Sequence, residues 1–157
     1  GAKVYADGNP LISRFVVEGD KKSTEAGGDM SFVPDVKLKD GDVVQGEGWA
    51  LQAVSTPGHA SNHMAYAWTD RKILFSGDHV MGWSTSIVSP PEGDMTAYMA
   101  SLAALAHRRW STFLPGHGPD VTDPAHRLAE LAAHRRQREA VGGLLDDAQA
   151  FGGLVGF

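Results

Sequence analysis

The segment Ile73-Leu74-Phe75-Ser76-Gly77-Asp78 carries the clearest structural signal in the chain, an apolar run that ends in a glycine and an aspartate. A short apolar run bounded by turn residues predicts a buried β-strand. Similar runs predict strands at residues 3–6, 32–38, 43–44, 49–54 and 63–68. Residues 39–42, with Asp-Gly at their centre, and residues 69–72 predict tight turns between them. We therefore expect an antiparallel meander.

Two helices are expected after these strands. Asp94 is a suitable N-cap for a segment with apolar residues at helical spacing, namely Met95, Tyr98, Met99, Leu102 and Leu105. Asp123-Pro124 places an N-cap before a proline and predicts the start of a second helix. Gly142-Gly143 is expected to stop or kink that helix. Strands followed by helices predict a layered α/β sandwich-type domain.

The composition restricts the classes of function. The 157 residues correspond to about one domain. Lys and Arg total 14 against 19 Asp and Glu, and the net charge of −5 disfavours broad electrostatic binding to nucleic acid or membranes. No cysteine is present, so any metal must be held by His and carboxylates. No signal segment or transmembrane span is present, which predicts a cytoplasmic location.

Three candidate ligands follow three predicted strands, at residues 49–54, 73–76 and 113–114. His59, Asp78 and His117 each come directly after a glycine, just beyond an apolar run. Neighbouring strands would bring them together, and imidazole with carboxylate suits zinc, with iron or manganese as alternatives. One carboxylate can bridge two ions. Taken singly, each residue is equally compatible with a turn, a cap or an ordinary loop position.

Several strings, read in order, resemble one family over about residues 3–138. They are Leu38-Lys39-Asp40-Gly41-Asp42, Thr56-Pro57-Gly58-His59-Ala60-Ser61-Asn62-His63, Phe75-Ser76-Gly77-Asp78, Tyr98-Met99-Ala100-Ser101-Leu102 and Pro115-Gly116-His117-Gly118. Together they resemble the metallo-β-lactamase superfamily. The most similar branch holds β-lactamase-like proteins, including single-strand RNA endonucleases, and the chain is also similar to glyoxalase II.

The resemblance implies a fold, a metal centre and roles for particular residues. The fold would be the C-terminal half to two-thirds of an αββα sandwich. His59 would bind the first metal, Asp78 would bridge two metals, and His117 would bind the second. His63 would support the site from behind without binding metal. The cofactor would be one or two zinc ions, with iron or manganese as alternatives.

One departure from the family is an absent motif. The leading His-x-His-x-Asp-His signature, which supplies two ligands to each metal, occurs nowhere in the sequence. The chain thus resembles the later part of a larger fold whose earlier part would precede Gly1. We expect a partial metallo-β-lactamase-like domain over residues 1–140. Residues 141–157 would be a tail packed on the core or the start of a helical accessory domain.

The resemblance implies metal-assisted hydrolysis, with water activated on zinc. The scissile bond is left open between ester, thioester, lactam, lactone and RNA phosphodiester. A small-molecule substrate is expected, with RNA as an alternative, no membrane and a homo-oligomer as the state of association. The competing interpretation is a catalytically incomplete chain that acts as a folding or interaction module. A weaker third alternative is di-iron redox chemistry, which usually accompanies a flavin domain.

The remaining polar residues are assigned to walls and surfaces. Candidate substrate walls are Trp83, Ser84 to Ser86 and Pro90-Pro91. His79 is expected to point away from the site as a supporting or structural residue. Solvated helix faces or helix ends are expected for His107, His126, His134, Arg108, Arg109, Arg135, Arg136 and Arg138.

Overall fold

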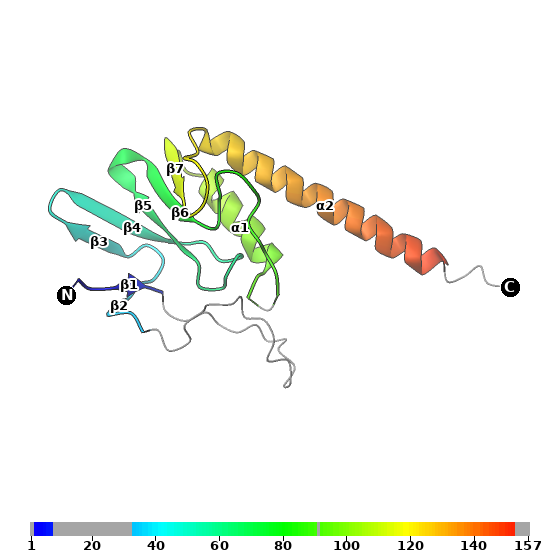
Figure 1. Ribbon diagram of the computed structural model, residues 1–157, viewed down its shortest axis with the longest axis horizontal. Helices are drawn as coiled ribbons and strands as arrows, with labels where there is room; N and C mark the ends of the chain where they lie inside the picture. Colours follow the sequence, from blue (N-terminus) through cyan, green and yellow to red (C-terminus); the bar gives the residue numbers. More distant parts are fainter. Residues whose placement is uncertain (1, 8–32, 91, 153–157) are drawn as a thin grey trace.

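The computed structural model describes residues 2–7, 33–90 and 92–152, and its centre is a five-stranded mixed sheet (Figure 1). In spatial order the strands are β3 Val43–Gly46, β4 Trp49–Ser55, β5 Met64–Trp68, β6 Ile73–Gly77 and β7 Thr112–Pro115. Strands β3 to β6 pair antiparallel with their chain neighbours, which confirms the predicted meander over this part. β7 lies parallel to β6.

The strands nearest the N-terminus pair differently. β1 Tyr5–Ala6 and β2 Val36–Lys37 form a separate two-stranded sheet and run parallel, with Tyr5 opposite Val36. The expectation of an antiparallel meander is therefore wrong at this end of the chain. Parallel strands need a crossover connection, and local turn signals carry no information about such a pairing.

Both predicted turns are present. Asp42 N–H donates to the carbonyl of Lys39 at 3.1 Å, and Gly41 between them has a φ of 87°. Between β5 and β6 the chain makes a short 3-10 helix, η1 Thr69–Arg71. The connection through η1 keeps β5 and β6 in antiparallel register, whereas the turn at residues 39–42 leads from the two-stranded sheet into β3.

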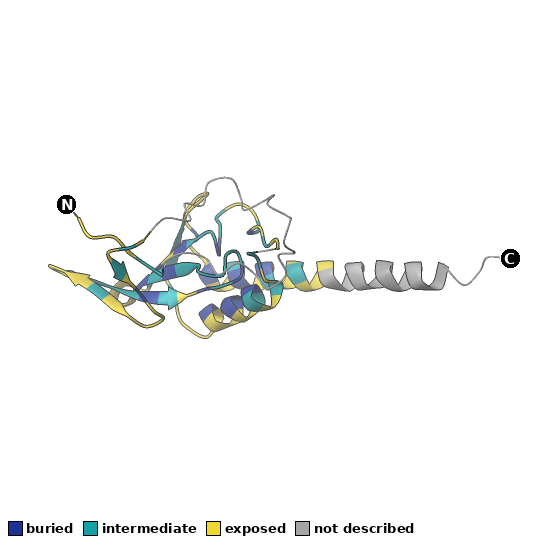
Figure 2. Ribbon diagram, turned by 90° about the horizontal axis from the view of Figure 1, so that it is seen from below, coloured by how far each residue is buried: buried dark blue, intermediate teal, exposed yellow. Residues whose placement is uncertain are grey.

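Two helices cover one face of the five-stranded sheet (Figure 2). They are α1 Met95–Ala106 and α2 Pro124–Gly152. As predicted, Asp94 Oδ1 accepts from the N–H of Ala97 at 2.8 Å, and Asp123 Oδ1 accepts from the N–H of His126 at 3.1 Å. These caps satisfy amide donors that have no partner inside the helix.

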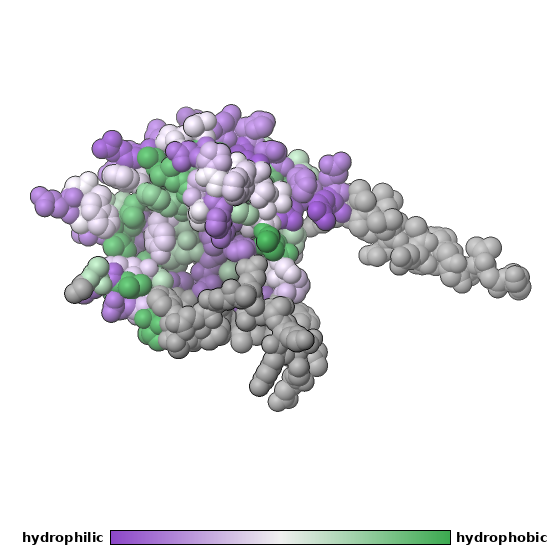
Figure 3. All heavy atoms as spheres, in the orientation of Figure 1, coloured by the Kyte–Doolittle hydropathy of each residue, from purple (hydrophilic) through white to green (hydrophobic). Residues whose placement is uncertain are grey.

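The core lies between this sheet face and the helices. Its buried side chains include Ala65, Ala67, Leu74, Tyr98, Leu102, Leu105, Phe113, Leu128 and Leu131. The alternating strand residue Phe75 points to the other face and is 37% exposed. On the side shown in Figure 3, apolar side chains reach the surface over the sheet. This sheet with helices packed on it confirms the predicted α/β class.

The second helix is longer than expected. α2 runs through Gly142 and Gly143 and ends at Gly152, so the prediction that the glycines stop it is wrong. A glycine inside a helix costs about 1 kcal/mol relative to alanine, which is too little by itself to end a long helix. In Figure 1 the end of α2 extends beyond the sheet. In the part of the chain that is described, no helix is long and apolar enough to cross a membrane.

Candidate metal centre

Three strands end at one edge of the sheet, and the segments after them carry the predicted ligands. β4 and β6 run in the same direction because each is antiparallel to β5, and β7 is parallel to β6. His59 follows β4, Asp78 follows β6 and His117 follows β7. The carboxyl ends of all three strands meet here, and the structure brings the three side chains together.

Asp78 lies between the two histidines, each facing a different carboxylate oxygen. Oδ2 is 3.9 Å from Nε2 of His59, and Oδ1 is 3.5 Å from Nε2 of His117. Both distances exceed the roughly 2.7–3.2 Å of an ordinary N–H···O hydrogen bond. The His117 side chain is 61% exposed and that of His59 is 18% exposed. The cluster is therefore open to solvent on the His117 side.

A backbone carbonyl orients the His59 ring. Nδ1 of His59 lies 2.6 Å from the carbonyl oxygen of Ile87. A carbonyl can only accept, so Nδ1 carries the proton and donates. In the neutral ring Nε2 then presents a lone pair toward the carboxylate of Asp78. A cation bound between Nε2 of this neutral ring and the carboxylate would be stabilised by both acceptors.

His63 holds the backbone of Asp78. Its Nε2 accepts from the Asp78 N–H at 3.2 Å, and its Nδ1 donates to Thr56 Oγ1 at 2.8 Å. Burial and the nearby His59 lower the pKa of His63 to about 4, although Asp78 and Thr56 act in the opposite direction. The ring therefore stays neutral at pH 7 and keeps its acceptor for the Asp78 amide. His63 contacts the carboxylate residue from behind, through its backbone.

Two glycines permit this close arrangement. Gly77 has a φ of 53°, in the left-handed region, and a Cβ there would lie 2.8 Å from Nε2 of His63. A Cβ on Gly116 would lie 2.6 Å from Oδ1 of Asp78. Side chains at these positions would displace the imidazole or the carboxylate. Steric exclusion of a side chain thus explains why glycine precedes Asp78 and His117.

His79 points into the core and away from the cluster. It is fully buried, and its ring centroid is 4.6 Å from that of Tyr98. Burial, with His63 and His59 nearby, lowers its pKa to about 3, so the ring is neutral at pH 7. Neither ring nitrogen has a hydrogen-bond partner among the described residues. His79 is a buried aromatic neighbour of α1.

His59, Asp78 and His117 are residue types that bind metal ions, but they are too few to complete the coordination of two ions. Imidazole and carboxylate are ligands that zinc and iron bind readily. Nowhere in the described ranges do three or more His, Asp or Glu side chains form a group that could hold an ion. His59 and His117 face opposite oxygens of Asp78, so each side offers two donors. A catalytic zinc usually has three protein ligands.

The segment after Asp78 forms walls beside the cluster. Trp83 is 71% exposed and lies against Gly118, where a Cβ would be 3.1 Å from the indole. Arg127 on α2 fastens this segment by donating to the carbonyls of Met81, at 3.0 Å, and Ser84, at 2.6 Å. Ser84 and Pro90 are exposed and Ser86 is buried, while Pro91 lies outside the described residues.

The helix residues assigned to solvent are exposed, with one exception. Exposed positions are His107, His126, His134, Arg108, Arg109, Arg136 and Arg138. Arg135 instead is partly buried, and its guanidinium donates to the carbonyl of Ser86. The expectation of a solvated face is therefore wrong for Arg135, because the segment after Asp78 packs over this turn of α2.

Two contributions to the site were not predicted from the sequence. The Ile87 carbonyl orients His59, and a backbone group at an ordinary apolar residue leaves no mark in the sequence. Thr56 supports His63, and its place in the quoted Thr-Pro-Gly-His string was the signal that could have identified it.

Comparisons with known proteins show which proteins the chain resembles. The chain is 33% identical over 114 residues to a protein named atrochrysone carboxyl ACP thioesterase from Aspergillus chevalieri, covering 71% of this chain and 36% of that protein. The metallo-beta-lactamase family protein TTHA1429 from Thermus thermophilus superposes with a TM-score of 0.65 and 28% identity, covering 71% of this chain and 38% of that one. TTHA1623, solved in a di-iron-bound form, gives a TM-score of 0.51 and 29% identity, covering 60% and 46%.

The coverage and the family match define what the chain shares with these proteins. The chain spans about 36% of the length of its thioesterase relative. Residues 4–117 match the family described as the metallo-beta-lactamase superfamily, and this range contains His59, Asp78 and His117. The chain therefore belongs to the metallo-β-lactamase superfamily.

Proposed function

We propose that His59, Asp78 and His117 are metal ligands of a hydrolase, with Asp78 shared between two ions. The observation that carries this proposal is the opposed geometry at Asp78, where an imidazole Nε2 faces each carboxylate oxygen. The missing ligands would come from a part of the protein outside this chain, which spans about a third of its thioesterase relative. A di-iron-bound structural neighbour supports a paired metal centre of this kind.

The chain's own residues would hold the centre in shape. His63 fixes the Asp78 backbone by accepting a hydrogen bond from the Asp78 N–H, and the Ile87 carbonyl fixes the His59 ring so that Nε2 is free. Such supporting partners tune ligand basicity and orientation. When bound, the metals would supply a Lewis acid for the scissile carbonyl and lower the pKa of water to about 7. We assign no proton-transfer role to His79, because it is buried away from the cluster.

A thioester is the substrate class that we propose. The relative named as an acyl-carrier-protein thioesterase shares the ligand-bearing part of the fold and supports this class. The exposed Trp83 beside Gly118 offers a wall on the open, His117 side of the cluster. The net charge of −5 favours a small acyl substrate over RNA.

The proposal can be tested on the full-length protein by measuring metal content and hydrolysis together. We expect one or two ions of zinc or iron per chain, and hydrolysis of an acyl thioester that stops when the metal is removed by a chelator. His117→Ala should lower the metal content and the rate, while His126→Ala, an exposed histidine on α2, should change neither.

Two results would contradict the proposal. A metal-free protein of native fold and full thioesterase activity would exclude the metal role of the cluster. Cleavage of single-stranded RNA, with no activity on acyl thioesters, would replace the proposed substrate by the RNA alternative.

A further inference from the structure

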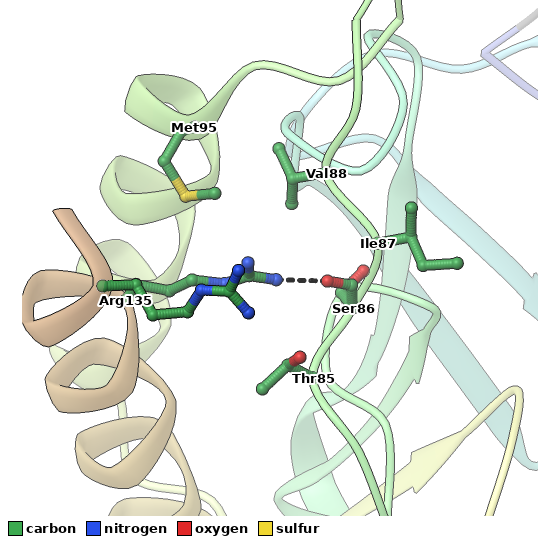
Figure 4. A pocket seen from close by; sticks show the side chains of 7 residues that line it. Thr85, Ser86, Ile87, Val88, Met95 and Arg135 are labelled. Carbon is green, nitrogen blue, oxygen red and sulfur yellow. Dashed lines mark hydrogen bonds between the residues drawn. The ribbon is translucent and has the colours of Figure 1, made fainter. Parts of the chain in front are cut away.

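Residues 85–88 form one wall of a cavity of about 450 Å³ that faces both helices (Figure 4). The cavity is lined by two arginines (Arg135 and Arg138), two hydroxyls (Thr85 and Ser86) and three apolar side chains (Ile87, Val88 and Met95). Figure 4 shows Arg135 entering from α2 on one side and Ser86 lying on the other. Cationic, hydroxyl and apolar groups therefore meet in one space.

Among the residues that the structure describes, no carboxylate pairs with Arg135. Its guanidinium donates to the Ser86 carbonyl and lies 5.4 Å from the ring centroid of Tyr98. Within the described part of the chain its Nε has no hydrogen-bond partner, and no carboxylate lies within ion-pair distance. Burial of a cation beside neutral groups alone costs free energy. A bound anion would offset that cost.

Ser86 provides a second, independent observation. The residue is 2% exposed, and its Oγ has no hydrogen-bond partner among the residues that the structure describes. An unpaired buried hydroxyl costs free energy because it has lost its hydrogen bonds to water. Because Ser86 lines the same cavity as Arg135, one ligand could satisfy both groups.

We infer that this cavity binds an oxyanion of the phosphate type. Arginine nitrogens and hydroxyls approach it from α2 and from residues 85–86, on opposite sides. A tetrahedral phosphate has acceptor oxygens on several sides, whereas a carboxylate offers two oxygens in one plane, and arginine binds phosphate through paired N–H groups. The apolar lining from Ile87, Val88 and Met95 would contact the stem of an organic phosphate ester.

This inference goes beyond the proposed hydrolysis and needs no metal. The cavity and the metal cluster lie on either side of residues 85–88, because Ile87 contacts His59 through its carbonyl while Ser86 contacts Arg135 through its own. Anion binding can therefore be measured in the presence of a chelator, and the result does not depend on whether the cluster binds metal.

The test is calorimetric titration of the metal-free protein at constant ionic strength with inorganic phosphate and with butyl phosphate. We expect saturable binding of phosphate that weakens about tenfold in Arg138→Gln, since a charge-assisted hydrogen bond is lost. Arg135→Lys keeps the charge but removes the planar fork and should also weaken binding. Arg136→Gln is the matched control, because it makes the same charge change at an exposed position outside this cavity.

The outcomes separate the sources of the anion and define failure. Tighter binding of butyl phosphate than of inorganic phosphate supports an organic ester as the ligand, and equal binding supports free phosphate. No saturable binding of either probe overturns the inference. Equal weakening by Arg138→Gln and Arg136→Gln also overturns it, because it indicates a general charge effect. Urea unfolding of each variant verifies that it is folded.

Discussion

The segment of residues 85–88 separates two regions of opposite chemistry. On one side the Ile87 carbonyl accepts from His59, in a cluster that presents lone pairs on imidazole nitrogens and carboxylate oxygens. On the other side the Ser86 carbonyl accepts from Arg135, in a cavity that presents N–H and O–H groups. The first region suits a cation and the second an anion, and adjacent peptide groups connect them.

The two regions also differ in how they are built. The cluster of His59, Asp78 and His117, which we propose as a metal site, depends on strand ends, which the meander and the parallel β7 bring to one edge of the sheet. The cavity lined by Arg135 and Arg138 depends on how α2 docks against residues 81–88. Arg127 donates to the carbonyls of Met81 and Ser84, and Arg135 donates to the carbonyl of Ser86. A change at the sheet edge should therefore affect the metal cluster first, and a change on α2 should affect the cavity first.

Asp78→Asn should have the largest effect, because it should abolish metal binding without changing the cavity lined by Arg135 and Arg138. Asp78 faces both histidines, so loss of its charge should remove both ions, whereas His117→Ala should remove one. We expect hydrolysis by the full-length protein to fall by at least about 100-fold, more than the loss of a supporting partner would cause. Metal analysis and thioester hydrolysis measure the effect.

The control for this substitution is phosphate binding in the same variant. The arginine cavity does not contain Asp78, so its affinity for phosphate should be unchanged. His134→Ala, at an exposed position on α2, should leave metal content and hydrolysis at the original level. Retention of both ions by Asp78→Asn would contradict the bridging role.

The grouping of His59, Asp78 and His117 could be anticipated from sequence, and the reason is physical. Gly77-Asp78 and Gly116-His117 follow short apolar runs, and strands of known direction place such residues at one edge. The helix starts at Asp94 and Asp123 were also predictable, because an N-cap acts on amides within its own turn. These features depend on local chemistry or on simple strand geometry.

The arginine cavity could not be anticipated in the same way. A charged run on a helix usually predicts a solvated face, and Arg136 and Arg138 follow that pattern while Arg135 does not. The difference arises where residues 85–88 pack on α2, and no local pattern encodes that contact. The parallel pairing of Tyr5 with Val36 was missed for a similar reason, since the two segments are far apart in the chain.

Acidification should destabilise the metal-free protein through a buried histidine of the core, His79. Burial lowers the pKa of His79 to about 3 from 6.5, so the unfolded chain binds a proton more readily than the folded one. The stabilisation by neutral His79 is complete above pH 6.5 and is lost as the pH falls toward 3. We expect the free energy of unfolding to fall by about 2 kcal/mol between pH 7 and pH 5 from this residue.

Urea unfolding of the His79→Phe variant tests the assignment. Phenylalanine keeps a ring against Tyr98 but does not titrate, so the difference between pH 7 and pH 5 should shrink by the His79 contribution. His63, whose pKa is lowered to about 4, should supply part of the remaining dependence, in the same direction. If the free energy of unfolding of His79→Phe still differs by the full amount between pH 7 and pH 5, other groups cause the pH dependence. The control is His126→Ala, at an exposed position, which should keep the full difference.

Arg127→Gln should loosen residues 81–84, which lead into the segment of residues 85–88. The Arg127 side chain is 14% exposed and donates to the carbonyls of Met81 and Ser84, so its loss leaves acceptors unpaired. We expect the free energy of unfolding to fall by about 1–3 kcal/mol. Glu130→Gln removes only the exposed ion pair with Arg127 and should leave the unfolding midpoint unchanged. Equal effects of the two substitutions would assign the role of Arg127 to the ion pair.

Ser86→Ala should have the smallest effect on stability and the most selective effect on binding. In the ligand-free protein the substitution removes a buried hydroxyl that has no partner among the described residues, so unfolding should be unchanged or up to about 1 kcal/mol more costly. Phosphate affinity should nevertheless fall, because one donor to the anion is lost. Ser89→Ala, at an exposed position just after residues 85–88, should change neither the free energy of unfolding nor the phosphate affinity. A clear loss of stability in Ser86→Ala would indicate that the hydroxyl is satisfied within the protein, and the anion cavity would then depend on the arginines alone.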